Sequence, residues 1–195
     1  MTNEFMQSIN GVQYHVRVNG EGPPILLLHG FTGSMNTWDA FIRDYGHCFQ
    51  IISIDLLGHG QTDAPNDSTR YEMHKAAKDI KDLLLSLDIS SANILGYSMG
   101  GRLALGFAVY YPEFVQSLIL ESSSPGLEDE QERKDRMDSD TQLAMRIRDQ
   151  GIERFVNEWE MIPLFTSQKR LPDYKKEEIR KERLSHKSLG LQNSL

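Results

Sequence analysis

Short apolar runs alternate with amphipathic segments over residues 12–122. Residues 12–18, VQYHVRV, alternate in polarity and predict a strand, which the preceding Asn-Gly turn can pair with a strand over 5–9. Continuous apolar runs in PILLLHG, QIISIDLLGHG, SANILGYS and VQSLILES predict buried strands, and the segments around 38–44, 73–87 and 99–111 predict helices between them. Buried strands separated by helices are typical of a mostly parallel sheet with helices on both faces.

The pattern changes at Pro125. Beyond this residue the chain has no apolar strand, and its charged, helical segments are interrupted at Pro163 and Pro172. The simplest interpretation of these charges is a set of solvated helix faces with i,i+4 pairs. We therefore expect a core over 1–124 and a helical lid over 125–195.

Composition narrows the class of protein. A chain of 195 residues with 39% hydrophobic content can form one globular core, and a net charge of −7 gives no basic footprint for nucleic acid. The single cysteine, Cys48, rules out an internal disulfide framework. We see no signal peptide and no apolar run long enough to span a bilayer. We therefore expect a soluble cytoplasmic protein without a membrane partner.

The strongest local motif is the G-x-S-x-G sequence centred on Ser98. It lies between a predicted strand, ANIL, and a predicted helix, which is the context of a nucleophile elbow. The flanking glycines permit a sharp turn that exposes the serine at a helix N-terminus, where the backbone N–H of Met99 faces developing negative charge. The bland alternative is a glycine-rich turn with an inert serine.

A second loop supports the catalytic interpretation. The strand in LLLHGFTGS ends at His29. Where a protein has a nucleophile elbow of this kind, the loop after an earlier strand supplies the second oxyanion-hole donor, and the N–H of Phe31 is the natural candidate here. His29 could act as a general base, but its place before the turn suits a structural hydrogen bond better. We likewise expect His59, in DLLGHG, to be a turn residue.

Arg102 is unexpected in a helix that otherwise reads LALGFAVYY. It lies four residues after Ser98, on the same helix face. The apolar helix implies burial of the charge, and a cation in the first turn opposes the helix dipole. A carboxylate of the substrate would offset both costs, whereas a pair with a nearby Glu or Asp is the alternative.

Taken together, the motifs resemble one known family. LHGFTGS, DLLGHG, GYSMGGR, ESSSPGL and NEWEMIPLF are similar to the α/β-hydrolase fold and, within it, to 2-succinyl-6-hydroxy-2,4-cyclohexadiene-1-carboxylate synthase of menaquinone biosynthesis. The similarity extends over essentially the whole chain. It implies a lyase that removes pyruvate from a succinyl-cyclohexene carboxylate, with the serine as base, an oxyanion hole for the enolate, and no cofactor or metal.

The resemblance also implies a set of substrate-binding residues for a small anionic polycarboxylate. Arg102 matches a carboxylate-binding arginine, and the other matching positions are Tyr97, Arg136, Trp159, Phe165 and Arg183. Arg133 is an alternative to Arg136. For the lid arginines the competing interpretation is solvated charge, and for the lid aromatics it is packing within the lid.

The catalytic acid and histidine of the family follow two further strands beyond the lid. Here the only histidine after Ser98 is His186, in a polar segment that we expect to be helical. Glu121 could serve as an acid but suits backbone capping better. We therefore expect a chain without its C-terminal strands and helices, and a C-terminal segment as a missing partner. A carboxylester hydrolase using the same serine and a non-catalytic relic are the alternative functions.

Overall fold

A six-stranded mixed sheet forms the centre of the computed structural model, which describes residues 2–195. The strands are β1 (Thr2–Ile9), β2 (Val12–Asn19), β3 (Pro24–Leu28), β4 (Gln50–Ile54), β5 (Ala92–Tyr97) and β6 (Val115–Glu121). Their order is β1-β2-β4-β3-β5-β6; β2 runs antiparallel to β1 and β4, and the remaining pairs are parallel. Asn10 and Gly11 both have positive φ and close the β1–β2 hairpin.

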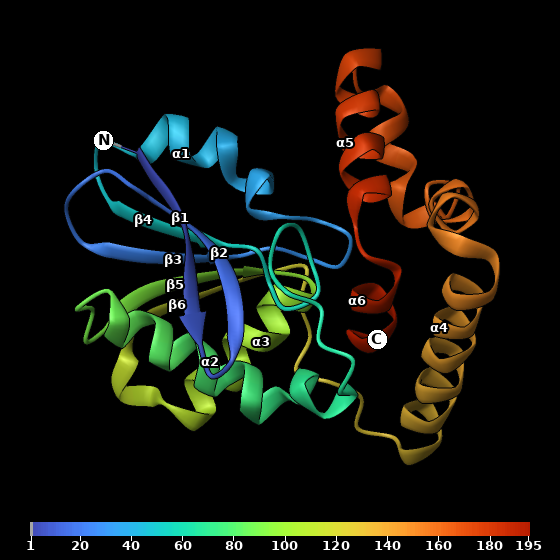
Figure 1. The fold of residues 1–195 in the computed structure, drawn as a ribbon, viewed down its shortest axis with the longest axis horizontal. Helices are drawn as coiled ribbons and strands as arrows, with labels where there is room; N and C mark the ends of the chain where they lie inside the picture. Colours follow the sequence, from blue (N-terminus) through green and yellow to red (C-terminus); the bar gives the residue numbers. More distant parts are fainter. Residues whose placement is uncertain (1) are drawn as a thin grey trace.

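Helices cover both faces of the sheet (Figure 1). The 3₁₀ turn η1 (Met35–Trp38) and α1 (Asp39–Tyr45) lie on one side, and α2 (Met73–Ser86) and α3 (Met99–Tyr110) lie on the other. The short turns η2 (Ser68–Tyr71) and η3 (Pro112–Phe114) precede α2 and β6. Alternate side chains of β3 enter opposite cores, because Leu26 and Leu28 pack toward α2 and α3 while Ile25 and Leu27 pack toward Trp38. The predicted α/β-hydrolase sheet with helices on both faces is confirmed.

The lid is a separate group of helices beside the sheet (Figure 1). It contains α4 (Glu130–Trp159), η4 (Pro163–Arg170), α5 (Asp173–Ser185) and α6 (Ser188–Asn193). The Asp129 carboxylate caps α4 by accepting the Glu132 N–H at 2.9 Å, and Gly151, with φ 81°, kinks the helix. The lid has its own apolar cluster around Ile147, Phe155 and Leu191. A division into domains at 124/125 stays a prediction.

β6 forms one edge of the sheet in the part of the chain that the structure describes. Its only strand neighbour is β5, and its side chains are mostly exposed, including 48% of Ile119 and 39% of Leu120. None of the helices formed by residues 2–195 has the length and apolar character needed to cross a membrane.

Candidate active site

Ser98 lies in a sharp turn between β5 and α3. Its backbone has φ 52° and ψ −114°, a strained conformation for a residue with a side chain. Three hydrogen bonds hold the turn: the Ser98 N–H donates to the Glu121 carbonyl at 2.9 Å, and the Ser98 carbonyl accepts from the Arg102 N–H at 3.0 Å and from the Ser123 hydroxyl at 2.6 Å. The strand–turn–helix context required of a nucleophile elbow is therefore present.

Glycines bring the loop after β3 against this turn. A Cβ on Gly30 would lie 2.9 Å from the Tyr97 ring and 3.3 Å from the Ser98 Cβ. A Cβ on Gly100 would overlap the carbonyl oxygens of Leu28 and His29. Only glycine permits these approaches, and they set Phe31 beside the serine. The oxyanion hole formed by the Phe31 and Met99 amides stays a prediction.

A cavity of about 610 Å³ lies between this turn and the lid. It brings together most of the residues predicted from the sequence, namely Phe31, Tyr97, Ser98, Met99, Arg102, Arg136, Trp159 and Phe165. Arg183, Arg133 and His29 do not line it. Arg133 instead donates to the carbonyls of Leu127 and Glu128, at 2.9 and 2.6 Å, near the start of α4.

Arg102 is exposed to the cavity, contrary to the burial expected from its apolar helix. The helix buries Gly100, Gly101, Leu103, Ala104 and Phe107, so its apolar contacts occupy one face and Arg102 lies outside that face. Within residues 2–195 the Arg102 guanidinium has no ion pair, so the alternative of a neighbouring carboxylate is not seen. The cation is available to an anionic ligand.

The lid contributes both charges and aromatic rings to the cavity. Arg136 is paired with Asp140 at 2.6 Å, and Glu158 is paired with Arg154 at 3.2 Å. The Trp159 ring centroid lies 5.4 Å from that of Phe31 and 5.7 Å from that of Phe165, both in edge-to-face geometry. These rings form an apolar part of the same cavity wall.

Arg183 lines a neighbouring cavity of about 1000 Å³. Its side chain is buried, donates to Glu160 at 3.3 Å and Gln168 at 3.1 Å, and stacks 4.4 Å over the Phe165 ring. Burial lowers the pKa of the guanidinium. The interpretation of Arg183 as solvated charge is therefore wrong. The two cavities share a wall of Phe31, Tyr97 and Phe165.

His29 and His59 are fully buried beside the Ser98 loop. His29 donates from Nδ1 to the Gly30 carbonyl at 2.8 Å and accepts the Leu56 N–H at Nε2, at 2.9 Å, so both nitrogens are occupied by backbone. Burial lowers the pKa of His29 to about 4 and that of His59 well below its usual value. His29 is thus bound as a neutral structural ring in this geometry.

His186 is buried and follows α5 in an extended conformation, so the expectation of a polar helical segment is wrong at this residue. Its Nε2 donates to the Thr32 carbonyl at 3.0 Å, and its Nδ1 accepts the Gly60 N–H at 3.2 Å. Its ring packs edge-on against His59, with centroids 5.3 Å apart. This histidine joins the lid to two core loops and does not line the Ser98 cavity.

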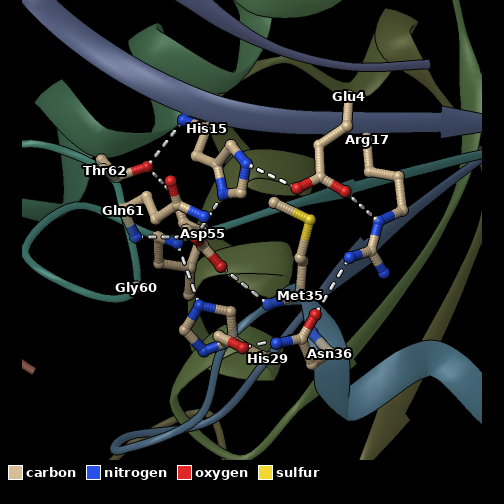
Figure 2. A network of polar contacts seen from close by, with 12 residues as sticks. Glu4, His15, Arg17, His29, Met35, Asn36, Asp55, Gly60, Gln61 and Thr62 are labelled. Carbon is tan, nitrogen blue, oxygen red and sulfur yellow. Dashed lines mark hydrogen bonds and ion pairs between the residues drawn. The ribbon is translucent and has the colours of Figure 1, made fainter. Parts of the chain in front are cut away.

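Asp55, at the end of β4, fixes the remaining loops (Figure 2). The carboxylate accepts the Met35 and Gln61 N–H groups and the Nδ1 of His15, each at 2.8 Å. The second nitrogen of His15 lies 3.0 Å from Glu4, which is paired with Arg17. This network lines the second cavity and holds η1 and the 56–62 loop against β2. Residues 2–195 contain no group of three or more His, Cys, Asp or Glu arranged to hold a metal ion.

The sequence interpretation missed Arg146, which also lines the Ser98 cavity. Positions 136, 139, 140, 143 and 146 of α4 all line it, at the three- and four-residue spacing of one helix face. That periodicity could have identified the residue.

Comparisons with known proteins agree with this architecture. A family model described as the alpha/beta hydrolase fold matches residues 23–186. A putative 2-succinyl-6-hydroxy-2,4-cyclohexadiene-1-carboxylate synthase of Bacillus subtilis (strain 168) is 44% identical over 190 residues, covering 95% of this chain and 68% of the relative.

Two solved structures show the same similarity. MenH from S. aureus has 33% identity and a TM-score of 0.84, covering 93% of this chain and 68% of that one. A thermophilic esterase from Thermogutta terrifontis, with malate bound, has 25% identity and a TM-score of 0.85, covering 98% and 70%. In each case roughly a third of the relative has no counterpart in these residues.

Proposed function

We propose that this chain, which belongs to the 2-succinyl-6-hydroxy-2,4-cyclohexadiene-1-carboxylate synthase family of α/β-hydrolase-fold proteins, provides the serine and the anion-binding wall of a pyruvate-eliminating lyase. The observation that carries the proposal is the Ser98 cavity, which a strained serine turn and Arg102, without an ion pair among residues 2–195, share with the aromatic side chains of the lid. A neutral apolar ester offers nothing for that cation to bind. A ring carrying carboxylates matches both walls.

In the proposed reaction Ser98 Oγ removes a proton from the ring carbon next to the succinyl ketone. The C–H electron pair moves onto the ketone oxygen, where the Phe31 and Met99 amides would stabilise the enolate. As the enolate collapses, the ketone C=O is restored, a ring C=C bond forms, and the ring C–O bond breaks. The leaving group departs as the enolate of pyruvate and takes up the abstracted proton to give pyruvate. Arg102 holds a substrate carboxylate beside the serine throughout, which fixes the ring relative to Oγ.

Ser98 needs a proton acceptor, because a lone serine hydroxyl is a weak base. Within residues 2–195 no side chain forms a hydrogen bond with its Oγ, and His29 and His186 are occupied by backbone groups. We therefore propose full activity for this chain joined to the region of the B. subtilis relative that has no counterpart here, and weak activity for residues 1–195 alone.

The test is pyruvate release from the succinyl-cyclohexene carboxylate substrate, followed with a coupled dehydrogenase. The chain joined to that region of the B. subtilis relative, called the fusion below, should release pyruvate. The Ser98→Ala variant of the fusion should lose at least about a hundredfold in kcat. Pyruvate release that is unchanged by Ser98→Ala would overturn the proposal.

A carboxylester hydrolase is the second candidate, since the Ser98 turn and the similarity to the esterase fit that chemistry as well. Hydrolysis of p-nitrophenyl acetate by the fusion, with no pyruvate release from the ring substrate, would favour it. Binding of the ring substrate without either turnover would instead point to a non-catalytic binder.

A further inference from the structure

We infer that Arg146 forms a second anion-binding position in the Ser98 cavity, separate from Arg102, and so selects ligands that carry two spaced negative groups. Both guanidinium groups line the same cavity of about 610 Å³, one from α3 in the core and the other from α4 in the lid. The inference rests on the proposed function for the class of ligand, a ring polycarboxylate.

Arg146 differs from its neighbours on α4 in having no carboxylate to neutralise it. Arg136, Arg148 and Arg154 are paired with Asp140, Asp149 and Glu158, at 2.6, 2.7 and 3.2 Å. In the described chain Arg146 forms no ion pair. The residues four positions before and after it, Gln142 and Gln150, are uncharged, and Asp149 at the third position is already bound by Arg148.

The backbone around Arg146 is held in place. Its neighbour Ile147 is fully buried in the lid's apolar cluster, and Leu143, one turn earlier, packs against the same cluster together with Phe31. Leu143 also lines the cavity. The arginine therefore extends from a fixed helix turn beside the cavity wall, so little ordering of the backbone opposes ligand binding.

Arg136 and Arg146 extend from well-separated turns of α4. Ten residues of α-helix separate them, which is about 15 Å along the axis. Arg136 is also engaged by Asp140. The cations of the cavity wall that lack a carboxylate partner among residues 2–195 are thus Arg102 on α3 and Arg146 on α4. A ligand with a single anionic group can satisfy only one of them.

Binding of two probes to the 195-residue chain tests the inference. The first is 2-succinylbenzoate, an aromatic dianion with the ring and succinyl carboxylates of the proposed substrate, and the second is benzoate, a monoanion. Arg146→Gln should raise the dissociation constant of the dianion about tenfold, because one charge-assisted hydrogen bond is lost. The same change should alter benzoate binding less than twofold. Arg146→Lys should recover part of the loss, and calorimetric titration provides the constants.

Lys134→Gln is the matched control, since it removes an exposed cation of the same helix that does not line the cavity. It should leave both constants unchanged. Equal losses in the two variants, or a dianion affinity unaffected by Arg146→Gln, would overturn the inference. The proposed function fails separately: a fusion that releases no pyruvate, while dianion binding still depends on Arg146, rejects the lyase and keeps the anion site.

Discussion

His186 donates a hydrogen bond from Nε2 to the carbonyl of Thr32 at 3.0 Å, across 154 residues of sequence. Because a carbonyl can only accept, Nε2 carries the hydrogen and Nδ1 is free to accept the Gly60 N–H. Thr32 follows Phe31 directly and has a positive φ of 63°, so this bond anchors the strained loop that borders Ser98. The lid and the predicted oxyanion loop are therefore held by one neutral imidazole.

Replacing this imidazole should loosen both elements. His186→Ala leaves the Thr32 carbonyl and the Gly60 amide without their partner, and we expect a loss of about 2–4 kcal/mol in the free energy of unfolding. His47→Ala, at an exposed position, is the control and should leave the free energy of unfolding nearly unchanged. Urea unfolding of wild type, His186→Ala and His47→Ala gives the comparison. An unchanged midpoint for His186→Ala would show that the two hydrogen bonds contribute nothing.

Stability should fall on acidification over a defined range. Burial lowers the pKa of His29 to about 4 and also lowers those of His59 and His186, so the folded state holds these rings neutral. An unfolded histidine binds its proton near pH 6.5. Between that pH and about 4 the unfolded state binds more protons, and stability therefore decreases as the pH falls.

The acid-dependent loss should be visible as a decreasing Tm from about pH 6.5 downward, and His186→Ala should make the curve shallower. The Asp55 carboxylate opposes the effect of burial, because its negative charge raises the pKa values of His29 and His186. Burial raises the pKa of Glu182, whose contribution has the opposite sign because its folded form retains a proton more readily. A Tm that is flat or rising down to pH 4.5 would contradict the expectation.

Arg102→Ala should separate two kinds of substrate. In the fusion, we expect about a tenfold loss of kcat/KM on the ring carboxylate and little change in the hydrolysis of p-nitrophenyl acetate, since only the former places an anion beside the serine. For Arg102→Lys we expect a kcat/KM on the ring carboxylate between those of wild type and Arg102→Ala. Lysine keeps the positive charge but lacks the planar guanidinium that can donate two parallel hydrogen bonds. Equal losses on both substrates would indicate a structural role for the arginine.

Gly100→Ala should damage the turn itself. The added methyl group would overlap the carbonyl oxygens of Leu28 and His29, which are backbone atoms of the sheet. We expect a cost of about 1–3 kcal/mol. Gly106→Ala, on the same helix, is the matched control. The added Cβ would lie 2.6 Å from the sulfur of Met73, whose flexible side chain can move away. Unfolding midpoints that fall equally in both variants would exclude this explanation.

Residues 1–195 alone should self-associate through β6. An edge strand whose outer side has no partner strand among residues 2–195, with exposed Ile119 and Leu120, offers free backbone groups and apolar side chains to another copy. Ile119→Lys should reduce association, because charged residues protect sheet edges. Light scattering over a range of concentrations measures both proteins. Wild type that stays a monomer at high concentration would contradict this prediction.

The strands and the serine turn could be predicted from the sequence because their signals are local. Each parallel strand is a continuous apolar run, and Gly96, which precedes Ser98, is required by its close approach to Gly100 and Gly101 within the same turn. The environment of His186 could not be predicted, since its partners lie 126 and 154 residues away and its neighbours in sequence are polar. The burial of Arg183 could not be predicted for a similar reason, because Glu160 approaches it only through the folding of the lid around Pro163 and Pro172.

The kink at Gly151 separates the two kinds of recognition that the lid provides. Arg136 and Arg146 precede it, whereas Phe155 and Trp159 follow it, so charge and aromatic surface belong to two segments joined at one residue of positive φ. A ligand with only an anionic group, or only a ring, has its complement in one segment. A ligand with both features has to span the kink, and the angle between the segments sets the geometry that it must match. Discrimination then depends on how the ligand's two features are connected as well as on each of them.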